Sequence, residues 1–200
     1  LLTVVAPPRL FPRSRCPFPI PTPNAERYRP YQRRGEWTVI TGSFRVGVEY
    51  GVLREAGTAE HILLHTVGGA GFVVTDTGWE RLGSGRSVVI EPHHAHYYGT
   101  SPDGGTWQFL WVHFFPPPHW RFLQDIPRSL PGLRLAEVGE ESVRRKIQRA
   151  LRESHALRKR GGRASEALAV NALERAFLWI VDSGDVRRRP DQRIHRAMEA

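Results

Sequence analysis

The hydrophobic pattern in the middle of the chain, from about Thr38 to Leu135, is that of short β-strands. Runs rich in Val, Ile, Phe, Tyr and Trp are separated by glycine-bearing turns, a spacing typical of a sandwich or small barrel. We expect "VGGAG" to form a tight turn between two strands, and "PPPHW" to end the series, because consecutive prolines do not fit a central strand. The predicted strands lie in the segments WTVITGSFRVGVEY, HILLHTV, AGFVVTD, GWERLG, RSVVIEP, AHYYGT and TWQFLWVHFF.

After Val138 the apolar positions recur at helical spacing. A first helix is predicted from Glu140 to Lys159, ended by "KRGGR", and a second from about Ala164 to Ser183. The glycine, proline and charges of "DSGDVRRRPDQ" predict a linker, after which "QRIHRAMEA" begins a further helix. The expected core stripe of the first helix is Val143, Ile147, Ala150, Leu151, Ser154 and Leu157, and that of the second is Ala169, Ala172, Leu173, Ala176, Phe177 and Ile180.

The second predicted helix carries another stripe beside its core. Leu168, Asn171, Arg175 and Leu178 follow the 3-4-3 spacing of a coiled-coil seam. A polar residue such as Asn171 within a seam fixes register and pairing at some cost in stability. We therefore predict self-association through this helix; the alternative is a partly buried helix with an incidental polar residue.

The composition narrows the class of protein. Two hundred residues, 40% of them hydrophobic and 24% charged, suit one globular domain. Cys16 is the only cysteine, which excludes an intrachain disulfide and suits a reducing cytoplasm. No apolar run approaches the roughly 20 residues that cross a bilayer, and "LLTVVAPP" lacks the basic flank of a signal peptide. These features predict a cytoplasmic protein with no membrane partner.

The net charge of +9 is unevenly distributed. Residues 1–36 hold seven Arg, two Glu and eight of the sixteen prolines, and residues 141–200 hold fifteen Lys or Arg and eight acids. Residues 37–140, in contrast, hold seven Arg and ten acids, so this segment would not attract a phosphate backbone. We expect residues 1–36 to form a Pro/Arg-rich arm that is disordered over residues 1–25.

Three histidines and two tyrosines cluster in "PHHAHYYG", residues 92–99. If residues 94–98 are extended, His94, His96 and Tyr98 share one face. Both faces of the strand that begins at Thr106 are apolar, so one face is expected to line a barrel interior and the other to meet a packed partner. The face of that strand with the larger side chains consists of Trp107, Phe109, Trp111 and His113.

Three interpretations of this cluster remain open. His94 and His96, with His113 as a third ligand, have the spacing of a metal site, although Glu91 falls on the opposite parity from His94. A small-molecule pocket would use the flat faces of Trp and Tyr and the polar tips of His and Tyr. The third interpretation is an ordinary aromatic core beside a solvated loop. Clustering on two strand faces favours the pocket.

Other chemistry is poorly supported. There is no G-x-S-x-G elbow, and Cys16 lies in the proline-rich arm. "VGGAG" is followed neither by a helix nor by Lys-Ser/Thr, so a phosphate cradle is not indicated. We therefore predict no catalytic residue, no resident metal and no cofactor, and do not expect an enzyme.

Several segments are similar to the sensory domain of AraC-family transcription regulators, over residues 37–200: "EHILLHTVGGAGFVVTDTGWERLGSGRSVVIEPHHAHYYG", "GTWQFLWVHFFPPPHW", "SEALAVNALERAFLWI" and "DQRIHRAMEA". The resemblance implies a mainly β fold, a cupin-like barrel (jelly roll) that binds a small effector, often a sugar. It also implies two C-terminal helices that dimerise as an antiparallel coiled coil, and a following helix-turn-helix domain. The expected parts are an arm (1–36), a barrel (37–138), a helical dimerisation element (139–183), and a linker with the start of a truncated helix-turn-helix domain (184–200).

The resemblance also implies site residues. Arg54, His96, Tyr98 and Trp111 keep the residue types of the family's sugar contacts, whereas the family's second pocket histidine is Phe109 here, which argues against arabinose itself. His94 and His113 are possible additional pocket residues, and Pro30 and Thr41 lie near the family's arm proline and pocket threonine. His93 stands where relatives usually have a turn glycine. The implied dimer seam is Leu168, Asn171 and Leu178. In metal-binding cupins the first strand motif supplies histidines and a glutamate, and "GGAGFVV" here has none.

We therefore expect the sensing and dimerising part of an AraC-type regulator, which binds a sugar-like effector, forms a homodimer through its C-terminal helices and contacts DNA only through a domain not present here. The alternative is a metal-dependent cupin enzyme, such as an isomerase or dioxygenase.

Overall fold

The computed structural model describes residue 11, residues 15–18 and residues 39–188. The strands are β1 (Val39–Gly47), β2 (Gly51–Arg54), β3 (His61–Thr75), β4 (Gly78–Gly83), β5 (Arg86–Ile90), β6 (His96–Thr100), β7 (Thr106–Phe114), β8 (Arg128–Leu130) and β9 (Leu133–Glu137). Two short 3-10 helices, η2 (Pro102–Gly104) and η3 (Arg121–Asp125), lie between strands, and α1 (Glu141–Arg160) and α2 (Arg163–Arg188) follow them.

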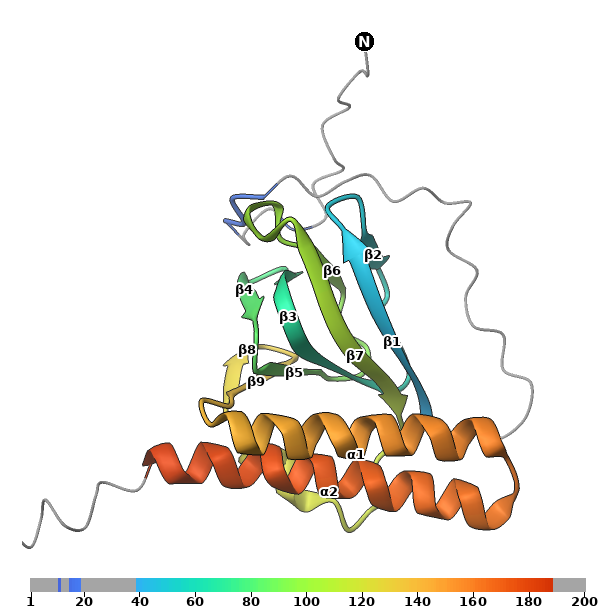
Figure 1. Ribbon diagram of the computed structural model, residues 1–200. Coiled ribbons are helices and arrows are strands. Elements are labelled where there is room, and N and C mark those ends of the chain that lie inside the picture. The colour runs from blue at the N-terminus through green and yellow to red at the C-terminus, as the bar shows by residue number, and fades with distance from the viewer. Residues whose placement is uncertain (1–10, 12–14, 19–38, 189–200) are drawn as a thin grey trace, which may run out of the picture.

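One long strand, β3, belongs to two antiparallel sheets. Its first part pairs with β5 and β7 in sheet A, whose order is β1-β7-β3-β5-β9-β8. Its second part pairs with β4 and β6 in sheet B, where β2 pairs with β6. An apolar cluster fills the space between the sheets. The chain is thus mainly β with two C-terminal helices, a cupin-like jelly roll as predicted (Figure 1).

The prediction of a tight turn at "VGGAG" is wrong, because these residues lie within β3. The register of β3 against β7 shifts between Thr66 and Gly68, and a β-bulge of this kind bends a strand. Gly69 has a φ of +67°, and a Cβ at this position would lie 1.9 Å from the carbonyl oxygen of Thr106. Glycines in a strand mark bulges and close backbone approach as well as turns.

Three strands were not anticipated. The predicted first run, Trp37–Tyr50, contains β1 alone, and β2 follows it after a turn at Val48–Glu49. The expectation that "PPPHW" ends the strands is also wrong, because the β8–β9 hairpin follows it and β9 pairs with β5. The prolines form a connection outside the sheet, and the chain then returns to the sheet edge.

The two helices form a hairpin that packs on the outer face of sheet A (Figure 1). Every residue of the predicted α2 core stripe is buried, and so is the α1 stripe except Leu157, which is partly exposed. These side chains pack on strand residues such as Leu63, Val112 and Phe114. None of the described helices is long and apolar enough to cross a membrane.

The predicted linker begins too early, because α2 continues to Arg188. A single glycine inside a helix, here Gly184, costs only about 1 kcal/mol relative to alanine, and the first proline after it is Pro190. The further helix expected from Gln192 lies outside the described residues.

Part of the N-terminal arm packs on the outer face of sheet B. Phe11 is buried, and the ring centroid of Phe18 lies 5.0 Å from that of Phe72. The same apolar cluster includes Tyr97 and Cys16. The expectation of disorder is therefore wrong for Phe11 and Phe18, whose rings cover apolar side chains of the sheet. Most of the arm lies outside the described residues.

The bend of β3 gives a first prediction. We expect Gly69→Ala to destabilise the domain by about 2 kcal/mol or more, because the new methyl group meets backbone at a positive φ. Gly68→Ala is the matched control, since the nearest atom to its Cβ would be 4.0 Å away on the Gln108 side chain. Urea unfolding measures the free energy of unfolding of both variants. Equal values for the two variants would contradict this account of the bend.

Candidate ligand-binding site

The inner face between the two sheets brings together the five pocket residues implied by the resemblance. Arg54 of β2 lies opposite His96 of β6 in the strand register, so their side chains share a face. Tyr98 lies two residues further along β6 and packs in the inner cluster with Phe109 and Trp111 of β7. The expected alternation of β7 is confirmed, because Leu110, Val112 and Phe114 pack instead in the cluster that contains the helices.

Tyr98 joins the polar groups of this face. Its hydroxyl oxygen accepts hydrogen bonds from the guanidinium of Arg54 and the hydroxyl of Tyr50. Burial raises the pKa of Tyr98 and of Tyr50, so both phenols are neutral at neutral pH. Burial also lowers the pKa of Arg54, which nevertheless stays charged. The network therefore holds one cation among neutral hydroxyl groups.

His96 is fully buried beside this network. Its Nδ1 donates to the carbonyl oxygen of His94 at 2.8 Å. Burial, reinforced by the charge of Arg54, lowers the pKa of His96 to about 4, so the ring is neutral at neutral pH. Its Nε2 is then an acceptor, and it has no hydrogen-bond partner among the described residues.

Trp111 supplies a flat aromatic surface. Its ring lies against Gly42 of β1, where a Cβ would come within 2.4 Å of it, so only glycine allows this approach. The ring of Phe44 stacks on Trp111 with a centroid distance of 5.8 Å and an interplanar angle of 29°. Phe44 is 43% exposed, so this edge of the aromatic surface meets solvent.

The aromatic surface continues into the sandwich as a closed wall. Trp107 and Phe109 stack with centroids 3.9 Å apart, and both are fully buried. The Nε1 of Trp107 donates to Thr66 Oγ1, which in turn donates to the carbonyl oxygen of Leu82. These hydrogen bonds hold the Trp107 ring in place. Phe109 packs on that ring and offers an apolar surface, not a polar contact.

Three further side chains of this face were missed from the sequence: Phe44, Tyr50 and Glu60. Glu60 directly precedes β3, and its Oε1 accepts a hydrogen bond from Nδ1 of His113 at 2.9 Å. Phe44 could have been found by alternation along β1, because it has the parity of Gly42. Tyr50 and Glu60 lie in connections, whose side-chain directions do not follow a strand period.

Two positions near the pocket differ from expectation. β6 begins only at His96, so His94 is not part of the strand face, and its ring lies against Gly132 in the β8–β9 turn. Thr41 faces α1, where His155 Nδ1 lies 2.9 Å from its hydroxyl. His93 has a φ of 60°, in the left-handed region that glycine adopts readily, so a turn glycine would suit the backbone at this position. Pro30 lies outside the described residues.

The residues present do not favour the metal interpretation. In the described part of the chain, no three side chains of His, Cys, Asp or Glu are grouped so that they could hold a metal ion. The ring of His94 lies against Gly132, and His113 is bonded to Glu60. Among residue 11, residues 15–18 and residues 39–188, the donor set of a metal-dependent cupin enzyme is therefore not assembled.

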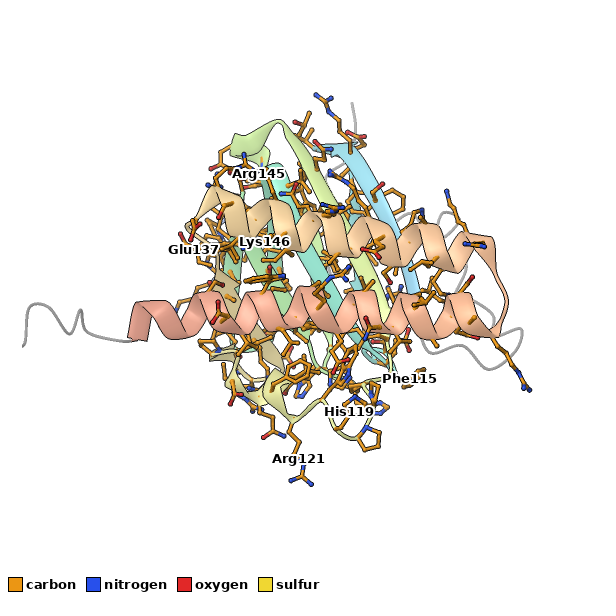
Figure 2. The ribbon with its side chains drawn as sticks, turned by 60° about the horizontal axis from the view of Figure 1, so that its bottom comes forward. Phe115, His119, Arg121, Glu137, Arg145 and Lys146 are labelled. Carbon is orange, nitrogen blue, oxygen red and sulfur yellow. The ribbon has the colours of Figure 1, made fainter. Side chains whose placement is uncertain are left out.

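The predicted dimer seam lies on the solvent side of α2. Leu168 and Leu178 are 54% and 48% exposed, and Asn171 is exposed between them. On one flank of α2, Lys146 of α1 lies 4.0 Å over the ring of Trp179. The loop that carries Phe115, His119 and Arg121 lies on the other flank (Figure 2). About half of each leucine side chain thus remains exposed on this side of α2.

A jelly roll with a polar and aromatic inner face and a helical hairpin on one sheet places this domain in the cupin-like class. The family model of the AraC-like ligand binding domain matches residues 48–177. The chain belongs to this family, and it is a ligand-sensing domain of the AraC type.

Solved structures show more distant similarities. ToxT from Vibrio cholerae is 10% identical with a TM-score of 0.42, and the match covers 66% of this chain and 52% of that chain. A cupin superfamily protein from Desulfitobacterium hafniense is 13% identical with a TM-score of 0.36, covering 42% of this chain and 72% of that chain. The search of curated proteins gave no match. The chain thus spans about half the length of ToxT.

Buried histidines give a prediction for the pH dependence of stability. Burial lowers the pKa of His65, which is bonded to Ser87, to about 4, as it does for His96. Because the unfolded state then binds more protons between pH 6.5 and 4, stability is full above pH 6.5 and falls as the pH falls toward 4, by up to about 3 kcal/mol for each histidine.

Urea unfolding at pH 7 and pH 5 tests this account. We expect His65→Asn to remove a substantial part of the pH-dependent loss but not all of it, because burial also lowers the pKa of His96 and of His61. The control is His119→Asn, which changes a side chain that is 69% exposed and should leave the loss unchanged. A loss that is the same in all three proteins would be incompatible with the assignment.

Proposed function

We propose that this domain is the sensing and dimerising part of an AraC-type transcriptional regulator, and that its effector is a small, sugar-like molecule bound on the inner face of the jelly roll. The observation that carries the proposal is the juxtaposition of the Trp111 ring with buried polar groups that can bond a ligand. The unpartnered Nε2 of His96 is an acceptor, and the Arg54–Tyr98 pair supplies donors.

Sugar chemistry fits this set of groups. A sugar ring has one apolar face, which stacks on an aromatic ring, and a rim of hydroxyl groups that both donate and accept hydrogen bonds. Trp111 and Phe44 offer the aromatic surface, while His96, Tyr98 and Arg54 offer acceptors and donors at its side. A purely apolar ligand would leave these polar groups without compensation for their lost solvent.

The same proposal assigns homodimerisation to α2. Leu168, Asn171, Arg175 and Leu178 keep coiled-coil spacing, and two exposed leucines on one stripe are best explained by burial against a second copy. Asn171 within the stripe would set the register of the pair. DNA contact would come from a helix-turn-helix domain beyond these 200 residues, and the single cysteine agrees with a cytoplasmic location.

Ligand binding is tested by a thermal-shift screen against neutral mono- and disaccharides. We expect at least one to stabilise the domain, because a ligand that binds only the native state raises its stability by RT ln(1 + [L]/Kd). Trp111→Ala should weaken that ligand by about tenfold or more, since the stacking surface is lost. Trp79→Ala, which removes a tryptophan from the outer face of sheet B, is the control. Stabilisation that survives Trp111→Ala would mean that the pocket is misassigned.

Dimerisation is tested by sedimentation equilibrium over a range of concentrations. The wild-type domain is expected to be a dimer at micromolar concentration, and Leu168→Glu with Leu178→Glu should make it a monomer, because charged residues at a seam are strongly unfavourable. Val48→Glu changes a side chain that is 51% exposed on the jelly roll and serves as the control. A wild-type protein that remains monomeric would refute this part of the proposal.

A further inference from the structure

A carboxylate lies at the inner face outside the set of pocket residues that the family resemblance implies. The Glu60 side chain is 16% exposed and the His113 side chain 14%. Oε1 of Glu60 accepts from Nδ1 of His113 at 2.9 Å, and the His113 ring packs edge-on against Trp111 at 5.6 Å. The pair therefore adjoins the surface that would stack on the ligand.

The carboxylate of Glu60 is ionised at neutral pH. The hydrogen bond from His113 is the main cause that lowers its pKa, and the charge of Arg54 acts in the same direction, while burial opposes both. Of these groups, His113 is on β7 and Arg54 is on β2, so Glu60 interacts with side chains from two strands of the candidate site.

Glu60 in turn acts on Arg54. Its charge favours the charged guanidinium, which burial disfavours, and Arg54 also donates to the hydroxyl of Tyr98. His96 is neutral and the phenols of Tyr50 and Tyr98 are neutral, so they do not add charge at this position. Glu60 is thus a carboxylate of the described inner face whose charge favours the charged form of Arg54.

We propose that Glu60, held by His113, determines the charge specificity of the pocket by compensating Arg54, so that the domain selects an uncharged, hydroxyl-rich ligand over its acidic counterpart. This inference rests on the proposed function, because it concerns the same site. A ligand hydroxyl donates to the carboxylate, which has more acceptor positions than His113 occupies. An acidic group in the same place meets a like charge in a partly desolvated site and is rejected.

Glu60→Gln is the direct test, because glutamine can still accept from His113 but carries no charge. Arg54 then becomes an uncompensated cation in a partly buried site, which attracts anions. The first probe is inorganic sulfate, replacing chloride at constant ionic strength. We expect sulfate to raise the Tm of the Glu60→Gln variant by about 2–4 °C and to leave that of the wild type unchanged.

Two further variants assign the effect. Glu55→Gln makes the same charge change at an exposed position next to Arg54 in the chain, and it should behave as the wild type does. The double variant Glu60→Gln with Arg54→Gln should lose the response to sulfate. Equal responses of the wild type and Glu60→Gln, or a response that persists without Arg54, would overturn the inference.

The second probe separates this inference from the proposed function. D-galactose and D-galacturonate, and D-glucose and D-glucuronate, differ only at C6, where the acid has a carboxylate in place of the hydroxymethyl group, and their binding is followed by tryptophan fluorescence. We expect the preference for the uncharged member to fall by about tenfold in Glu60→Gln. A wild-type protein that prefers the acids would overturn the inference alone. If no sugar binds while sulfate still distinguishes the variants, the sugar assignment fails and the role of Glu60 stands.

Discussion

The structure depends on one constraint, the shared strand β3. Because its two halves pair in different sheets, the chain must bend at the bulge near Gly68 and Gly69, and this bend brings the sheets face to face. The bend creates three surfaces, and each of them carries one feature of the domain. The space between the sheets holds the polar and aromatic site, the outer face of sheet A holds the helices, and the outer face of sheet B holds Phe11 and Phe18.

The inner face has to satisfy two demands at once. As the core between two sheets it must exclude water, and as a ligand site it must carry polar groups, whose burial is costly without hydrogen bonds. The structure meets both by pairing polar groups with one another: Arg54 with Tyr98, and Glu60 with His113. Two buried ring nitrogens of the described inner face, Nε2 of His96 and Nε1 of Trp111, have no hydrogen-bond partner. Buried polar atoms without a partner call for an explanation, and the proposed ligand supplies one at this face.

Strand alternation and helical spacing predicted most of the fold and the direction of the β7 side chains. The period of two separated Trp111 from Val112 correctly, and the spacing of three and four found every core residue of α2. Errors occurred where a glycine or proline cluster has two structural meanings: "VGGAG" bends a strand instead of ending it, and the residues around Gly184 continue a helix. Tyr50 and Glu60 could not be found, because the direction of a side chain in a connection depends on tertiary packing and not on period.

The positions of Gly42 and Thr41 connect the site with the helices. These neighbours in β1 point to opposite faces, so Gly42 supports the ring of Trp111 while Thr41 meets His155 of α1, whose Nδ1 lies 2.9 Å from the hydroxyl and 3.0 Å from the carbonyl oxygen of Thr41. A ligand can change the arrangement of the helices only if it binds one arrangement better than the other. The Trp111 ring lies so close to Gly42 that there is no room for another atom between them. A shift of the Trp111 ring toward β1 therefore has to move β1. The adjacent residue of β1, Thr41, is bonded to His155 of α1. The aromatic surface and α1 are therefore mechanically linked through these two adjacent residues, in addition to the packing of Val112 and Phe114 of β7 on the helices.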